Sequence, residues 1–268
     1  MQIRPTPQTI WKRPAYLPFV QSELTDELLS AAEIQFGHSL PQEFVEILAV
    51  QNGGPIRFRY PELVGDTIAG IGNKFPSLLD DDIKDAQEYV DFSLDDLIPF
   101  DGDGHWFHCL DYRNGKAKPC VSFIDVECNS QTKIADSFSE YLESMELDIE
   151  RELVLKNIEN FDHAKRRLQE IFNLKPEEKI SNLGVPYSKF QTADDWQACF
   201  WITSNRVANG YSGDSPATFE FSGSALLFPE LPDDTVIFEC SEEFLDAYRD
   251  QLLANQLELL TIEQAADG

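Results

Sequence analysis

The chain has 268 residues, of which 42% are hydrophobic, so it can bury a core and is not expected to be disordered. Its formal net charge of −27 argues against nucleic acid or an anionic membrane as a direct partner, because phosphate binding needs clustered Lys and Arg side chains. The sequence shows neither a signal peptide nor an apolar run long enough to span a membrane, and we expect a cytoplasmic protein.

Two helices are predicted near the start of the chain. The stretch TDELLSAAEIQFG can be capped by Thr25 at its beginning, and Gly37 can end it. A second helix is predicted from Pro41, a favourable residue for a first helical turn. It should stop at NGG, residues 52–54, because Asn and Gly tolerate the backbone of a tight turn.

The middle of the chain is typical of a sheet. Alternating or short apolar runs bounded by Gly, Pro and Asn predict strands in residues 56–60, 65–72, 97–100, 105–112 and 119–125. RNGK, residues 113–116, predicts a hairpin turn between the last two. A short helix is predicted around residues 83–90. Another begins in IADSFSEYLESM, with Asp136 as its expected N-cap.

Helical spacing of apolar residues continues from residue 149 to 171, and the loop 184–195 is interpreted as a joint between domains. Three further strands are predicted in WQACFWITS, ATFEFSGSALLF and TVIFEC, and a final helix should begin after Ser241. The second half of the chain should therefore also combine helices with strands.

The stretch DGDGHWFHCLDYR, residues 101–113, concentrates Asp, His, Cys and Gly. It does not fit a calcium-binding loop, because the sixth position of that motif needs Gly and Trp106 stands there. On a strand, His105 and His108 would point to opposite faces and could not chelate one zinc ion. We therefore predict a turn followed by a strand, no metal site, and an Asp111 that holds an Arg or neighbouring backbone.

Catalytic motifs are absent from the sequence. It contains four histidines, no G-x-S-x-G elbow and no glycine-rich phosphate loop. His108 and Cys109 are neighbours on a predicted strand and would point apart, so they do not form a catalytic pair. The five cysteines show no C-x-x-C spacing and are interpreted as reduced thiols. We expect no catalytic residue and no cofactor.

Negative charge is concentrated in two windows, residues 80–103 and 229–268, which hold ten acids against Lys84 and eleven acids against Arg249. Such patches favour a basic protein as partner. For the binding face we predict six carboxylates, and the alternative for each is a solvated loop. They are Asp80, Asp81, Asp82, Asp85, Asp101 and Asp103.

Four motifs in order resemble the SUKH superfamily, which includes the Smi/Knr-type cell-wall regulators of yeast. They are LPQEFVEILAVQNGG, IPFDGDGHWFHCLDYR, VSFID and IADSFSEYL, and the resemblance covers about residues 9–145. It implies a mixed sheet flanked by helices and no catalysis. Bacterial members look like immunity proteins that neutralise secreted toxins, often nucleases, whereas yeast members look like signalling scaffolds. The pattern departs from the family after about residue 150.

The expected fold is α+β, with a mainly antiparallel sheet flanked by helices in residues 1–148 and an α+β extension of unassigned role in residues 149–268. The expected function is an immunity-type, non-catalytic binding module whose acidic surface occupies the basic cleft of a nuclease toxin. Two alternatives stay open. One is a regulatory scaffold without a toxin partner, and the other is an enzyme housed in residues 150–268.

Overall fold

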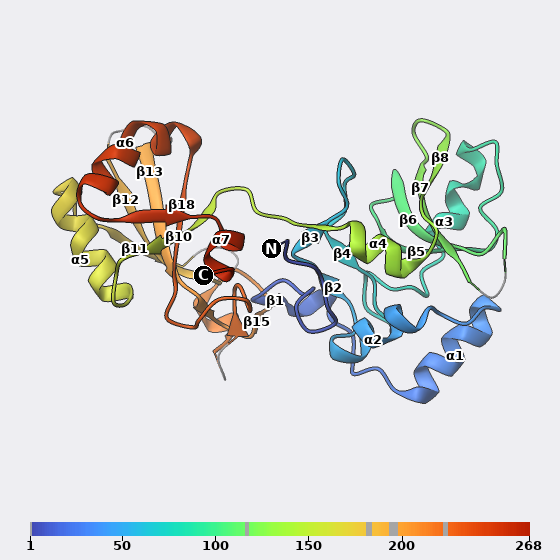
Figure 1. Ribbon diagram of the computed structural model, residues 1–268. Coiled ribbons are helices and arrows are strands. Elements are labelled where there is room, and N and C mark those ends of the chain that lie inside the picture. Colours follow the sequence, from blue (N-terminus) through green and yellow to red (C-terminus); the bar gives the residue numbers. More distant parts are fainter. Residues whose placement is uncertain (1, 116–117, 181–183, 193–197, 222–224) are drawn as a thin grey trace. The chain divides into compact units, whose positions relative to one another are not determined.

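The computed structural model describes residues 2–115, 118–180, 184–192, 198–221 and 225–268, except the side chains of Asp82 and Ile180. The chain divides into two compact units, here called the N-terminal unit (Arg4–Asp148) and the C-terminal unit (Ile149–Gly268 with the start of the chain). Each unit contains helices and antiparallel strands, which confirms the predicted α+β class (Figure 1).

Short helices and short strands surround a four-stranded sheet in the N-terminal unit. The helices are α1 (Asp26–Phe36), α2 (Gln42–Val50), α3 (Asp82–Asp85) and α4 (Phe138–Ser144), with 3-10 turns η1 (Leu17–Phe19) and η2 (Ala86–Tyr89). The strands are β1 (Ala15–Tyr16), β2 (Gly54–Pro55), β3 (Phe58–Arg59), β4 (Thr67–Ile68), β5 (Leu97–Gly102), β6 (Trp106–Asp111), β7 (Cys120–Asp125), β8 (Ser130–Ala135) and β9 (Glu146–Leu147). The sheet has the antiparallel order β5-β6-β7-β8.

Helix α1 has the ends that its sequence predicts. The hydroxyl of Thr25 accepts a hydrogen bond from the backbone N–H of Leu28 at 3.2 Å, which satisfies one of the free donors of the first turn. Gly37 follows the helix in the left-handed conformation, with φ of 72°. Helix α2 begins one residue later than predicted, so Pro41 is its N-cap and not its first helical residue.

The four-stranded sheet carries an apolar layer on each face. On one face, Phe107, Cys109 and Ile124 are buried together with Ile83 of α3. On the other face, the Phe100 ring lies 5.6 Å from that of Phe138 in α4, and both are nearly inaccessible to solvent. Figure 1 shows α3 and α4 on opposite sides of this sheet. Because side chains along β5 and β6 point alternately to the two faces of the sheet, these strands contribute apolar residues to two separate cores.

The stretch 101–113 is a turn followed by a strand, as predicted. Strand β5 runs through Asp101 to Gly102, two residues further than expected, so the turn itself is shorter than DGDG. Gly104 has φ of +95°, a conformation that L side chains rarely adopt. Strand β6 then places Asp111 at its buried end.

Two predicted helical segments are wrong in part. In the segment IADSFSEYLESM, Ile134 and Ala135 end the outer strand β8, and Ser137, not Asp136, caps α4 by accepting the backbone N–H of Glu140. The helix expected across residues 149–171 is interrupted. Its first part is strand β10 (Glu152–Lys156), and only α5 (Phe161–Phe172) is helical, after an Asn160 cap. The apolar run LVL fills a strand because antiparallel neighbours lie on both of its sides.

The C-terminal unit is built on a six-stranded antiparallel sheet. Its further helices are α6 (Glu242–Ala254), which Ser241 caps as predicted, α7 (Ile262–Ala266) and the 3-10 turn η4 (Pro216–Thr218). Its further strands are β11 (Glu177–Ile180), β12 (Pro186–Gln191), β13 (Cys199–Ser204), β14 (Arg206–Val207), β15 (Gly210–Tyr211), β16 (Phe219–Glu220), β17 (Ala225–Leu226), β18 (Val236–Cys240) and β19 (Glu258–Leu260). The order of the sheet is β11-β12-β13-β18-β10-β19.

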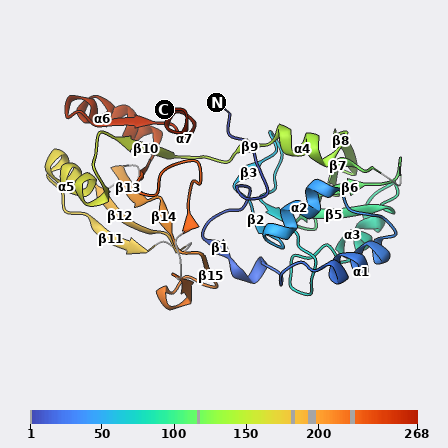
Figure 2. The same cartoon turned by 60° about the horizontal axis from the view of Figure 1, so that its bottom comes forward.

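Helices α5 and α6 supply the core of this unit. Leu168 of α5 and Phe244 of α6 pack with Phe200 of the central strand β13, and all three are fully or almost fully buried. Figure 2 shows α5 beside the strands of this sheet. The predicted domain joint at 184–195 is wrong, because β12 is an inner strand of the sheet. Part of that stretch, and part of the RNGK turn, lie outside the described residues.

Candidate functional site

The acidic segment that leads into α3 carries the first group of predicted binding residues. Asp81 is exposed, and its carboxylate lies 2.6 Å from the ammonium group of Lys84. Asp80 is half-buried and accepts a hydrogen bond from the backbone N–H of Ser77 at 3.0 Å. Asp85 is exposed on α3, whereas the side chain of Asp82 lies outside the described part of the chain.

Asp103 lies in the turn between β5 and β6 and is exposed. Its carboxylate accepts backbone N–H groups of His105 at 2.9 Å and Trp106 at 3.3 Å. This arrangement is an Asx-type turn, in which the side chain replaces a backbone acceptor. Asp103 therefore shapes the turn while it contributes negative charge to the surface.

Asp101 differs from Asp80, Asp81, Asp85 and Asp103 because its carboxylate points into the unit. It accepts backbone N–H groups from Thr67 and Gly102, at 3.3 Å and 3.0 Å. Burial raises the pKa of Asp101 to about 7, and the nearby charges of Asp66 and Asp103 act in the same direction. Near neutral pH the group is only partly ionised, so it adds less negative potential than its formal charge implies.

The structure separates the predicted face into two groups. Asp80 and Asp81 line a hollow beside Leu97, at the beginning of β5. Asp101 lies four residues further along the same extended strand, which corresponds to about 13 Å. The N-terminal part of the acidic window and the β5–β6 turn are thus distinct places on one unit.

A buried polar cluster next to Asp101 is not foreseen from the sequence. The Nδ1 atom of His108 lies 2.8 Å from the hydroxyl of Tyr141, and both side chains are buried. Burial lowers the pKa of His108 to about 4, so the ring is neutral at physiological pH. Burial also raises the pKa of Tyr141 well above its usual value. Only the alternation of β6, which turns His108 inward, hints at this cluster.

The melting temperature of Asp101→Asn, relative to that of wild type, is expected to be higher at pH 8 than at pH 4. The folded pKa of Asp101, about 7, exceeds the usual value of 3.8, so the folded state loses stability as pH rises between these values. The amide cannot ionise, but its single oxygen can accept only one of the two N–H groups, because Thr67 and Gly102 donate to different carboxylate oxygens of Asp101. The result that tests the pKa is therefore the change in the effect of the substitution between pH 4 and pH 8. Calorimetry across this pH range measures the trend. Asp85→Asn is the control for the change in net charge. If the melting temperatures of Asp101→Asn and wild type change in parallel with pH, the pKa of Asp101 is not raised on folding.

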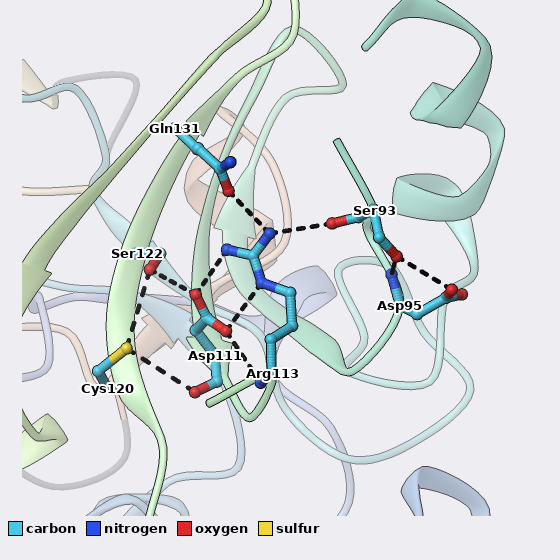
Figure 3. A network of polar contacts seen from close by, with 7 residues as sticks. All are labelled: Ser93, Asp95, Asp111, Arg113, Cys120, Ser122 and Gln131. Atoms are coloured by element: carbon cyan, nitrogen blue, oxygen red, sulfur yellow. Dashed lines mark hydrogen bonds and ion pairs between the residues drawn. The ribbon is translucent and has the colours of Figure 1, made fainter. Parts of the chain in front are cut away.

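Asp111 and Arg113 form a second polar network at the end of β6 (Figure 3). Two guanidinium nitrogens of Arg113 donate to the two carboxylate oxygens of Asp111, at 2.9 Å and 2.6 Å, and Ser122 donates to the same carboxylate at 2.7 Å. Arg113 also donates to the Gln131 side chain and to the Ser93 carbonyl. The predicted role of Asp111 as a holder of an Arg is confirmed.

This network has the character of a structural tie. Burial raises the pKa of Asp111, but the hydrogen bonds from Arg113 and Ser122 outweigh that effect and leave it below its usual value. Cys120 lies beside the network, and burial raises the pKa of its thiol, which disfavours the reactive thiolate.

Within the described residues, no group of three or more His, Cys, Asp or Glu side chains is arranged to hold a metal ion. The C-terminal unit has a hollow of about 350 Å³, and its described lining includes Lys156, Glu159 and Asp234 but neither His nor Cys. None of the helices that the structure describes has the length and apolar character needed to cross a membrane.

Comparison with known proteins identifies a family for the N-terminal unit. Residues 23–144 match the SMI1 / KNR4 family (SUKH-1), a span that contains α1 to α4 and the whole four-stranded sheet. No curated protein and no solved structure matches the chain. The match falls within residues 9–145, where the sequence resembles that superfamily, and leaves the C-terminal unit outside it. Residues 23–144 of this chain thus form a domain of the SUKH superfamily, in its SMI1 / KNR4 (SUKH-1) family.

Proposed function

We propose that the protein is a non-catalytic immunity-type binding module that neutralises a basic, nuclease-type toxin. The observation that carries the proposal is an exposed acidic segment on a SUKH domain. Between residues 80 and 103 the exposed carboxylates outnumber Lys84, the one basic residue of the segment. They belong to Asp81, Asp85, Glu88, Asp91, Asp95, Asp96 and Asp103.

The mechanism is competition for a basic cleft. A nuclease holds the phosphates of its substrate with Lys and Arg side chains. A surface that presents carboxylates to the same cleft attracts the toxin over a distance and then excludes the nucleic acid. Bound metal, cofactor and bond chemistry on this chain are not needed for that effect.

Affinity capture from the native cells, with the intact protein as bait, tests the function. We expect a basic protein in the eluate that degrades nucleic acid when purified and loses this activity when about one equivalent of the bait protein is added. A captured partner without nuclease activity would replace the immunity function by that of a regulatory scaffold. A partner whose nuclease activity persists in excess bait would also contradict the proposal.

The double variant Asp85→Lys/Glu88→Lys should associate with the captured partner about tenfold more slowly and with a weaker dependence on salt. Both side chains are exposed, so the fold should tolerate the change. Asp246→Lys/Asp250→Lys makes the same change in charge on exposed positions of α6. Stopped-flow measurement of the association rate distinguishes the two double variants. Equal rates for wild type and Asp85→Lys/Glu88→Lys would show that the surface around Asp85 and Glu88 does not belong to the binding face.

A further inference from the structure

We propose that a hollow in the N-terminal unit, here called the α1–β5 hollow, receives one arginine side chain of a basic partner protein. It is bounded by the end of α1, the segment that enters α3, and the start of β5. The residues on which the inference rests are Leu78, Asp80, Ile83, Asp96 and Leu97. The inference depends on the proposed function, because the arginine belongs to the basic partner described there.

The size of the hollow selects the kind of occupant. Its volume is about 140 Å³. Pockets for drug-sized ligands and cofactors have volumes of about 300–1,000 Å³, so this space is too small for such molecules. It suits a single long side chain that enters from a docked protein. Interface hot spots are commonly side chains of this kind, inserted in a pocket, and Arg is enriched among them.

The floor of the hollow is apolar. Leu78, Ile83 and Leu97 all line it, with exposed fractions of 2%, 3% and 7%. The aliphatic stem of an Arg or Lys can lie on such a surface while its charged end stays at the rim.

The rim of the hollow is acidic. The Oδ2 atom of Asp80 accepts a hydrogen bond from the backbone N–H of Ser77, and the Oδ1 atom of Asp96 lies 3.0 Å from Nε2 of His38. Each carboxylate therefore has its other oxygen without a hydrogen bond from the described residues. Lys84 is the one lysine or arginine in the described lining, and its ammonium group is bound to Asp81.

The backbone and the carboxylate of Asp96 are both fixed by neighbouring residues. Its backbone has φ of 58°, and its carbonyl accepts the N–H of Tyr112 at 3.0 Å. The ring of His38, which contacts its carboxylate, is stacked on Tyr112 with centroids 4.2 Å apart. A carboxylate fixed in this way loses little freedom on binding, which favours affinity. The buried Nδ1 atom of His38 has no hydrogen-bond partner among the described residues.

The same features favour arginine over lysine. A guanidinium group is planar, is more weakly hydrated than an ammonium group, and offers several donors that can bridge two carboxylates. In the α1–β5 hollow these carboxylates would be Asp80 and Asp96, above the apolar floor. A lysine offers the same charge but cannot span both with a fixed fork.

Two labelled peptides of equal charge, nona-arginine and nona-lysine, test the inference with the full chain. We expect fluorescence anisotropy at about 150 mM salt to show about fivefold tighter binding of nona-arginine. The conservative variants Asp80→Asn and Asp96→Asn should reduce this preference toward equality. Equal affinities for the two peptides in wild type, or an undiminished preference in both variants, would overturn the inference.

A charge-matched pair of variants avoids any dependence on the folding of the Asn variants. Gln35 lines the α1–β5 hollow and is exposed, whereas its neighbour Ile34 is 81% exposed and does not line it. Gln35→Lys should weaken the preference for nona-arginine, and Ile34→Lys should leave it intact. Equal effects of the two would count against the site.

Failure of this inference and failure of the proposed function can be told apart. If the arginine preference is absent but Asp85→Lys/Glu88→Lys still slows association with a captured nuclease, the α1–β5 hollow does not bind arginine, and the proposed function remains. If the preference depends on Asp80 and Asp96 but no nuclease is captured, the hollow remains and the immunity function is wrong.

Discussion

Replacing Phe200 with alanine is expected to lower the free energy of unfolding of the C-terminal unit by about 3–5 kcal/mol. Phe200 is fully buried at the centre of the six-stranded sheet. Its ring centroid lies 4.7 Å from that of Phe190 and 4.9 Å from those of Phe238 and Phe244. Alanine removes the transfer free energy of the ring and leaves a cavity, because these neighbours, on two strands and a helix, cannot all move inward.

Urea denaturation followed by circular dichroism measures this loss. The control is Leu253→Ala on α6, where the side chain is 52% exposed and a change within about 0.5 kcal/mol is expected. A loss of less than about 1 kcal/mol for Phe200→Ala would show that the aromatic cluster is not the core of the unit.

Arg113→Ala should lower the free energy of unfolding of the N-terminal unit by about 3 kcal/mol. The side chain of Asp111 is only 3% exposed, and that of its partner Arg113 is 21% exposed. Without the guanidinium group, the carboxylate would keep its hydrogen bond from Ser122 but remain buried without a counter-charge. Removing one member of a buried pair costs far more than removing an exposed one, because the remaining charge cannot regain its water.

The pair Lys84–Asp81 provides the matched control. Its side chains are 73% and 69% exposed, so Lys84→Ala should cost less than about 1 kcal/mol. Arg113→Lys should fall between the two, since it keeps the charge and loses the two-point geometry. Similar losses in Arg113→Ala and Lys84→Ala would contradict the structural role of the network.

The effect of Arg113→Ala also depends on pH. The folded pKa of Asp111 lies below its usual value, so the pair stabilises the protein above the unfolded pKa near 3.8, and this contribution disappears as pH falls through the folded pKa. The difference between wild type and Arg113→Ala should therefore be largest near neutral pH and shrink toward pH 3.

Features set by local chemistry could be predicted from the sequence, and features set by distant neighbours could not. The caps of α1 depend on Thr25 and Gly37, which lie beside the helix, and both were predictable. Strand β8 has four exposed polar residues, Ser130 to Lys133, so it lacks the alternation that identifies a half-buried strand. It exists because β7 provides a ladder of hydrogen bonds, which the local sequence does not reveal.

The same distinction between local and distant causes applies to the residues of the candidate site. The pairing of Asp111 with an Arg was predictable because Arg113 is two residues away on the chain. The inward position of Asp101 was not, since it depends on Thr67, in a strand 34 residues earlier. The α1–β5 hollow was equally hidden, because its walls come from three segments that meet only in the folded unit.

Strand β8 also affects how the protein behaves when it is crowded. It is the outer strand of the described four-stranded sheet, and the open side of such a strand can template the addition of another chain. Lys133 lies on it, next to Asp136, and an incoming backbone would have to strip water from this ion pair. This charged pair therefore opposes the addition of a further strand along that side of the described sheet.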